Sequence, residues 1–113
     1  MLPKSLNRLT STKISEGLAL SETFLLLAET FQVLGDVSRL RIVWALSKKE
    51  FSVNELSEML EMSQPNVSHH LRTLRNLRLV RVRKQGRESF YALDDQHING
   101  LLKEGIEHVE DLL

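Results

Sequence analysis

Two pairs of potential metal ligands stand near the C-terminus, at a spacing that a single helix cannot use. Asp95 and His97 form an Asp-x-His pair, and His108 and Asp111 form a His-x-x-Asp pair, with eleven residues from one histidine to the other. Eleven helical residues make about three turns, so both histidines share one face and lie about 16 Å apart along the axis. Zinc binds an imidazole nitrogen at about 2.0–2.1 Å, so one ion cannot reach both histidines of one helix.

Two copies of such a helix, packed antiparallel, would bring all four ligand types together. The Asp95/His97 end of one copy would meet the His108/Asp111 end of the other, which gives two identical sites by symmetry. Two imidazoles and two carboxylates form a tetrahedral set that Zn²⁺ favours and Co²⁺ accepts. Because protein ligands fill every position, the site favours regulatory metal sensing over catalysis.

Other carboxylates offer alternative assignments. Glu110 is a neighbour of Asp111 and competes for the role of fourth ligand, whereas Glu104 and Glu107 fit ordinary surface charge. Either histidine taken alone fits an exposed, polar helix face. The metal site is therefore predicted from the four positions together.

Helical periodicity predicts the elements that carry these residues. The expected helices are Leu18 to Leu34, a second one capped by Asp36, Val53 to Leu60, one from the Ser63 cap to about Leu77, and Ile98 to Leu113 after a cap at Asp94 or Asp95. Expected core positions are Phe24, Phe31, Leu40, Val43, Trp44, Leu46, Leu56, Met59, Leu60, Val67, Leu71 and Leu74. Gly35 is expected to end the first of these helices.

The middle of the chain predicts a DNA-binding motif. Two helices meet at a tight connection, and Pro65 fits the first turn of the second, where its missing N–H costs nothing. The runs Leu79 to Lys84 and Ser89 to Leu93 alternate and are joined around Gly86, which predicts a β-hairpin. The order αααα-ββ-α predicts a mainly α fold with a small β-hairpin, a winged helix-turn-helix that forms a dimer.

Charge is segregated along the chain although the total is balanced. The sequence has 15 basic and 15 acidic residues, yet no acid lies between Met62 and Arg87. Basic and short polar residues in this stretch predict contacts with double-stranded DNA, the polar ones reading base edges and the basic ones contacting phosphates. The candidates are Gln64, Asn66, Ser68, His69, Arg72, Arg75, Arg83, Lys84 and Arg87. A solvated basic face is the alternative, while a His69/His70 metal pair is disfavoured because adjacent helical residues diverge by about 100°.

Length and composition set the remaining expectations. The 113 residues suit one domain, with 1–14 as a flexible arm and 15–113 as the DNA-binding and dimerisation domain. The absence of cysteine excludes disulfides and thiolate metal sites. No apolar run approaches the roughly 20 residues of a membrane span, and the N-terminus lacks a signal-peptide core. We therefore expect a cytoplasmic protein without a membrane partner.

The segments FQVLGDVSRLRIVWALS, LSEMLEMSQPNVSHHLRTLRNLRLVRVRKQGRESFYAL and DDQHINGLLKEGIEHVED carry a family resemblance. The sequence resembles the ArsR/SmtB family of metal-responsive repressors, and its last segment resembles the branch that senses zinc or cobalt through the C-terminal helix. The resemblance implies a homodimer that binds a palindromic operator and leaves it when zinc binds. Asp111 departs from the glutamate or histidine of the family pattern, and Phe51 and Ser52 stand where thiolate ligands of the family's other site would be.

Two rival functions remain from the sequence. A regulator of the same fold could respond to a partner or small molecule rather than to metal. A small metallohydrolase built on the His/Asp cluster is disfavoured, because no nucleophile motif or pocket-forming loop is evident. We therefore predict a regulator and not an enzyme.

Overall fold

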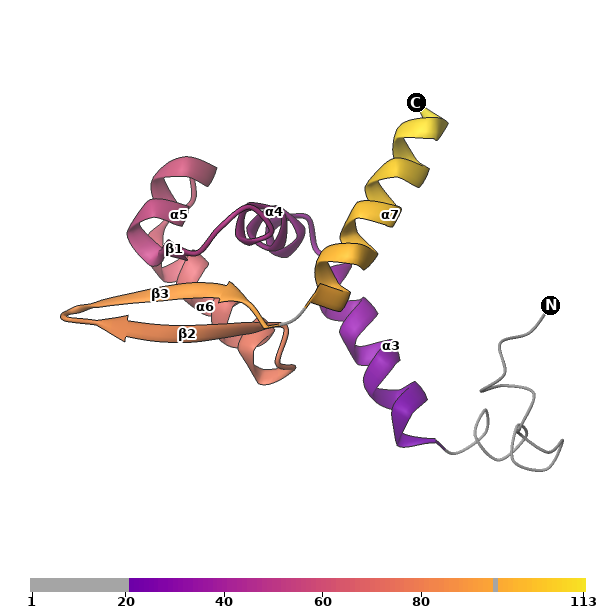
Figure 1. Ribbon diagram of the computed structural model, residues 1–113, viewed down its shortest axis with the longest axis horizontal. Helices are drawn as coiled ribbons and strands as arrows, with labels where there is room; N and C mark the ends of the chain where they lie inside the picture. Colours follow the sequence, from indigo (N-terminus) through magenta and orange to yellow (C-terminus); the bar gives the residue numbers. More distant parts are fainter. Residues whose placement is uncertain (1–20, 95) are drawn as a thin grey trace, which may run out of the picture. The chain divides into compact units, whose positions relative to one another are not determined.

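The computed structural model describes residues 21–94 and 96–113, which separate into two units between Gln32 and Val33. The elements in chain order are α3 (Glu22–Leu34), α4 (Val37–Leu46), β1 (Phe51–Ser52), α5 (Val53–Leu60), α6 (Gln64–Asn76), β2 (Val80–Gln85), β3 (Glu88–Leu93) and α7 (Gln96–Leu112) (Figure 1). This order confirms the predicted αααα-ββ-α arrangement and adds the short strand β1. The predicted N-terminal arm, residues 1–14, lies outside the described residues, as does the first part of the helix expected from Leu18.

Side-chain caps explain where the middle helices begin. Asp36 accepts a hydrogen bond from the Arg39 backbone at 3.0 Å and opens α4, as predicted. Ser52 opens α5 with a capping box, in which Ser52 and Glu55 each bond the other's backbone N–H. Ser63 caps α6, and Pro65 lies in its first turn. These caps satisfy N–H groups that have no partner inside a helix.

A left-handed residue makes the tight connection between α5 and α6. Glu61 has φ 54° and ψ 48°, and Met62 then donates its backbone N–H to the Ser57 carbonyl at 3.0 Å. This bond satisfies a C-terminal carbonyl of α5 and reverses the chain toward Ser63. The predicted helix-turn-helix thus consists of α5 and α6.

The hairpin is the outer part of a three-stranded antiparallel sheet of order β1-β3-β2. Val80 pairs with Leu93 at its base and Gln85 pairs with Glu88 at its tip, so the two-residue turn is Gly86-Arg87. Gly86 has φ 63°, the left-handed conformation expected of it. Strand β1 pairs Phe51 with Tyr91 and Ser52 with Phe90, and its two residues are too few to show an alternation in the sequence.

The core lies between α4, α5, α6 and the base of the sheet. Its buried members are Leu34, Ile42, Val43, Ala45, Leu46, Leu56, Leu60, Val67, Leu71, Leu74, Leu79 and Val80. The stripe predicted for α6 (Val67, Leu71 and Leu74) is fully buried, which confirms that assignment. The buried stripe fixes α6 so that its opposite face is solvent-exposed.

Five residues predicted for the core are exposed, and those predictions were wrong for the single chain. They are Phe24 at 47% exposure, Phe31 at 51%, Leu40 at 37%, Trp44 at 46% and Met59 at 46%. On α4 the core is filled by Ile42, Val43 and Leu46, which leaves the side of Leu40 and Trp44 outside it. Hydrophobic periodicity identifies an apolar face but does not say whether the same chain covers it.

Helix α7 stands apart from the core. It contains no buried residue, and only Ile98 and Leu102 pack against the core cluster. Figure 1 shows α7 leaving the base of the hairpin, at the end opposite to the hairpin tip. No helix within the described ranges has the length and apolarity needed to span a bilayer.

Candidate functional site

The exposed face of α6 carries predicted DNA-contacting residues. Gln64, Asn66, His69, Arg72 and Arg75 are exposed, and Ser68 is half-buried. At about 100° per residue, His69 and Arg72 lie opposite the buried stripe, whereas Asn66 is turned toward one flank. The helix therefore presents imidazole and guanidinium groups outward from a rigid base.

A groove joins the first turns of α6 to the hairpin. It has a volume of about 310 Å³ and is lined by Ser52, Val53, Asn54, Gln64, Ser68, Arg87, Glu88 and Ser89. Three predicted DNA-binding residues, Gln64, Ser68 and Arg87, thus meet around one groove although they come from two separate segments. The Gln64 amide donates to Asn54 of α5. Asn54 was not among the predicted site residues, because a single asparagine in the first turn of a helix does not by itself indicate a binding site.

Strand alternation divides the predicted basic residues of the wing between two faces. Val80 and Val82 face the core side of β2, so Lys84 shares their face, while Arg81 and Arg83 lie on the opposite face. Arg87 lies in the turn at the tip. The sequence alone groups Arg83 with Lys84, but the pleat separates them.

Arg83 is occupied by partners within the protein. Its guanidinium donates to the Glu50 carboxylate and, at 2.7 Å, to the Gln85 side chain, and it lies 5.0 Å from the centre of the Phe90 ring. The hydrogen bond from Arg83 lowers the pKa of Glu50 below its usual value, and the same bond raises the pKa of Arg83. The sequence stretch from Met62 to Arg87 lacks acids, but the fold supplies one from the segment that precedes β1.

His70 faces inward, in contrast to its neighbour His69. Its Nδ1 lies 3.4 Å from the Arg39 guanidinium, whose Nε also donates to the Val33 carbonyl at 2.7 Å. Burial lowers the pKa of His70, the charge of Arg39 adds to this effect, and Asp36 opposes it. The two ring centres of His69 and His70 are 5.7 Å apart, and neither ring belongs to a metal-binding cluster among the described residues.

The predicted metal ligands are distributed along α7. His97 lies in its first turn and His108 and Asp111 in its last two turns, and all three are exposed. Asp95 lies outside the described residues. Within residues 21–94 and 96–113 of one protomer, no three His, Asp or Glu side chains come together to hold a metal ion. The predicted site needs two protomers, so it remains a prediction.

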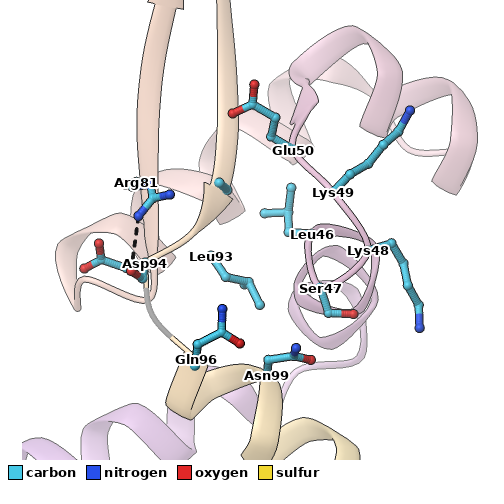
Figure 2. Close-up of a pocket in the computed structure, with 11 residues that line it drawn as sticks. Leu46, Ser47, Lys48, Lys49, Glu50, Arg81, Leu93, Asp94, Gln96 and Asn99 are labelled. Atoms are coloured by element: carbon cyan, nitrogen blue, oxygen red, sulfur yellow. Dashed lines mark hydrogen bonds between the residues drawn. The ribbon is translucent and has the colours of Figure 1, made fainter.

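A cavity of about 410 Å³ lies between the end of α4, the hairpin base and the first turn of α7, and Figure 2 shows the residues that line it. Leu46 and Leu93 line its apolar part, and the amides of Gln96 and Asn99 extend into it from α7. Arg81 donates to the Asp94 carbonyl at 3.4 Å across this region. The start of α7 is therefore connected to the base of the wing.

Backbone hydrogen bonds extend this connection to α6. Asp94 donates its N–H to the Leu79 carbonyl, and Leu79 donates its own N–H to the carbonyl of Leu74, both at 3.0 Å. Leu74 is fully buried in α6. Two backbone hydrogen bonds thus connect the residue at the end of the hairpin, Asp94, to α6 by way of Leu79.

Together, the helix-turn-helix, the basic face of α6 and the adjoining hairpin define a winged helix-turn-helix protein. Residues 36–82 match the family model described as "Bacterial regulatory protein, arsR family". The chain is 45% identical over 85 residues to the transcriptional regulator NmtR of Mycobacterium tuberculosis, covering 75% of this chain and 71% of NmtR. The chain belongs to the ArsR family.

Other relatives agree with this assignment. KmtR of Mycobacterium tuberculosis is 40% identical and the SmtB homologue of Synechocystis is 41% identical, each over 75% of this chain. The chain spans 65% of KmtR and 64% of the SmtB homologue, slightly less than two thirds of each. All three relatives are named transcriptional regulators or repressors and none is named as an enzyme, in line with the class predicted from the sequence.

Solved structures have the same fold. The solution structure of apo-NmtR superimposes with a TM-score of 0.69 at 42% identity, covering 80% of this chain and 76% of that one. The homodimeric winged helix-turn-helix domain Mb0332 of Mycobacterium bovis gives a TM-score of 0.72 at 22% identity, covering 82% of this chain and 86% of that one. This second likeness concerns the fold alone.

Proposed function

We propose that the protein is a homodimeric transcriptional repressor, acting in the cytoplasm, that binds operator DNA and releases it when zinc binds. The observation that carries the DNA-binding part is the acid-free face of α6, where Arg72 and Arg75 are exposed beside polar side chains. The buried stripe of the same helix holds this face outward. Such a surface attracts phosphates and fits an element that enters the major groove.

The proposed contacts divide by chemistry. Gln64, Ser68 and His69 would read base edges with their short polar side chains, and Asn66 belongs to the edge of that set. Arg72 and Arg75 on α6, with Lys84 and Arg87 on the hairpin, would contact phosphates and fix the register. Arg83 was predicted to contact DNA with these residues, and in the structure its guanidinium already donates to Glu50 and Gln85.

The proposal of a homodimer is supported by α7. Leu101, Val109 and Leu112 are exposed at 41%, 51% and 72%, on a helix with no buried residue. An amphipathic helix with an uncovered apolar face gains stability by packing on a partner. Mb0332, which has the same fold, is a homodimer. Two copies would place their α6 helices in successive major grooves, roughly 34–36 Å apart.

The proposed zinc sites lie between the two α7 helices. Asp95 and His97 of one protomer would join His108 and Asp111 of the other, and Co²⁺ is an acceptable alternative ion. His97 and His108 lie on one helix, and both are exposed. Zinc would supply no chemistry beyond holding these helix ends together. Glu110 remains the alternative to Asp111.

A second candidate is a regulator of the same fold that responds to a small molecule. The cavity of about 410 Å³ beside the start of α7 favours it, because its size and mixed polar and apolar lining fit a small ligand. Equilibrium dialysis against zinc separates the two candidates. Tight, stoichiometric zinc binding by the dimer supports the metal-responsive regulator, and its absence supports the second candidate.

The DNA-binding proposal is tested by selecting duplexes from a random-sequence library with the purified protein. We expect an enriched inverted repeat and a strong decrease in affinity with added salt. Arg72→Ala and Arg75→Ala should weaken binding to all sequences alike and reduce the salt slope by about 0.9 for each phosphate that the variant no longer neutralises. An unenriched library would contradict the proposal, and an unchanged slope would remove these arginines from the interface.

A further inference from the structure

The hairpin is attached to the body of the domain on the face that points away from α6. Arg83 extends from β2 across its cross-strand partner Phe90 in β3 and reaches Glu50, which precedes β1. The order of the sheet, β1-β3-β2, places β3 between the two charged residues. One side chain therefore spans the sheet and connects its outer strand to the segment that follows α4.

Three interactions fix the position of this guanidinium. Glu50 and Gln85 accept its hydrogen bonds, and the Phe90 ring lies beneath it. Glu50 also lines the cavity at the end of α4, together with Arg81. The hydrogen bond from Arg83 lowers the pKa of Glu50 below its usual value, in keeping with a charged carboxylate paired with the guanidinium.

We propose that Glu50 and Arg83 form a clamp that sets the orientation of the wing, and that Arg83 is a positioning residue rather than a phosphate contact. This inference rests on the proposed DNA-binding function and assigns Arg83 a role different from that of Lys84. Lys84 lies on the core-side face of the same strand, opposite its cross-strand partner Ser89, which lines the groove beside α6, whereas Arg83 makes the ion pair with Glu50. The clamp keeps the tip, with Arg87, at a fixed position relative to α6.

The expected size of the effect on DNA affinity follows from the exposure of the two side chains. The Arg83 and Glu50 side chains are 50% and 41% exposed, and an exposed ion pair contributes modestly. Breaking the clamp should therefore lower DNA affinity by about two- to fivefold per protomer without unfolding the domain. The number of phosphate contacts does not change, so the salt slope should stay the same.

The test uses a double-mutant cycle on the full-length protein, with the duplex that the protein itself selects as the probe. Glu50→Gln and Arg83→Gln should both weaken binding, Arg83→Gln at least as much because it also loses the contacts with Gln85 and Phe90, and the double variant should be no weaker than Arg83→Gln alone. Lys84→Gln is the matched control, adjacent on the same strand, and it should lower both the affinity and the salt slope. A swap of the two charges, Glu50→Arg with Arg83→Glu, should restore most of the affinity.

Two outcomes would refute the clamp. If Glu50→Gln tightens binding while Arg83→Gln weakens it and flattens the salt slope, Arg83 is a phosphate contact and the clamp is refuted. Effects that add in the double variant would also refute the clamp.

A second measurement is independent of DNA. Amide ¹⁵N relaxation of the free protein should show greater mobility at residues 84–88 in both single variants than in the wild type. Unchanged mobility would count against the clamp even if DNA binding is never detected. If the protein does not bind DNA but the hairpin is more mobile in both variants, the proposed function is refuted and the clamp is supported.

Discussion

His70 is the histidine of α6 whose environment is set by another helix. Burial lowers its pKa, Arg39 and His69 contribute in the same direction, and Asp36 opposes them. A histidine whose folded pKa lies below its unfolded value binds protons more readily in the unfolded chain. The folded state is therefore favoured at neutral pH and loses stability as the pH falls below about 6.5, the usual value.

We predict that His70→Gln removes this part of the pH dependence. Urea unfolding between pH 7.5 and 5 should show a falling free energy of unfolding for the wild type and a smaller fall for the variant. The control is His69→Gln, which retains His70 and its burial and removes only the smallest contribution to the lowered pKa of His70, so most of the wild-type slope should remain. Parallel curves for the wild type and His70→Gln would contradict the assigned cause. Asp36 also contributes to the pH dependence, because the backbone hydrogen bond from Arg39 lowers its pKa. The stability that depends on its charge is lost only below about pH 3.8, outside this window.

At the scale of elements, α5 depends on the capping box at Ser52. Ser52 is 3% exposed, and its side chain accepts the Glu55 backbone N–H at 3.1 Å, while the Glu55 side chain accepts the Ser52 N–H at 2.9 Å. Because Ser52 also pairs with Phe90 in the sheet, this residue joins a strand to a helix. Its loss affects both elements.

Ser52→Ala should destabilise the domain by about 1–2 kcal/mol, the upper part of the range for N-cap removal, because the Glu55 N–H is left without its partner. The free energy of unfolding in urea measures the change. The same substitution at the exposed cap Ser63, where the hydrogen bond is 3.3 Å, should cost less. An equal or greater loss at Ser63 would show that burial of the cap is not what matters.

The elements differ in how far the sequence could predict them. Asp36, Ser63 and Pro65 are local signals, and the helices that they open were predicted correctly. Strand β1 has two residues and exists only because β3 pairs with it. The clamp was not predictable either, since Glu50 lies 33 residues from Arg83 and only the folded sheet brings them together.

The candidate sites also divide into parts that the local sequence predicts and parts that depend on the folded structure. The basic face of α6 followed from periodicity and charge, because a helix with a buried stripe has one outward face. The groove that joins Gln64 and Ser68 to Arg87 depends on the placement of the hairpin. Trp44 and Phe31 are predicted for the core but are exposed in the structure. Hydrophobic periodicity cannot separate a face that the same chain covers from one that it leaves uncovered.

At the scale of the whole molecule, the proposed function depends on a second copy. The four proposed metal ligands cannot converge on one helix, and α7 has no fully buried residue within the protomer. The start of α7 is bonded through Asp94 and Leu79 to the end of α6. An ion that holds two α7 helices together would thus act on both basic helices through short backbone connections.

The most direct test is a zinc titration of the protein bound to its selected duplex, with DNA binding measured by fluorescence anisotropy. Zinc should weaken DNA binding, by about 5–150-fold for a coupling of ordinary size, and the duplex should weaken zinc binding by the same factor. His97→Ala and His108→Ala should keep metal-free DNA affinity and lose the response to zinc. An affinity that zinc leaves unchanged, or a response that survives in both variants, would contradict the account.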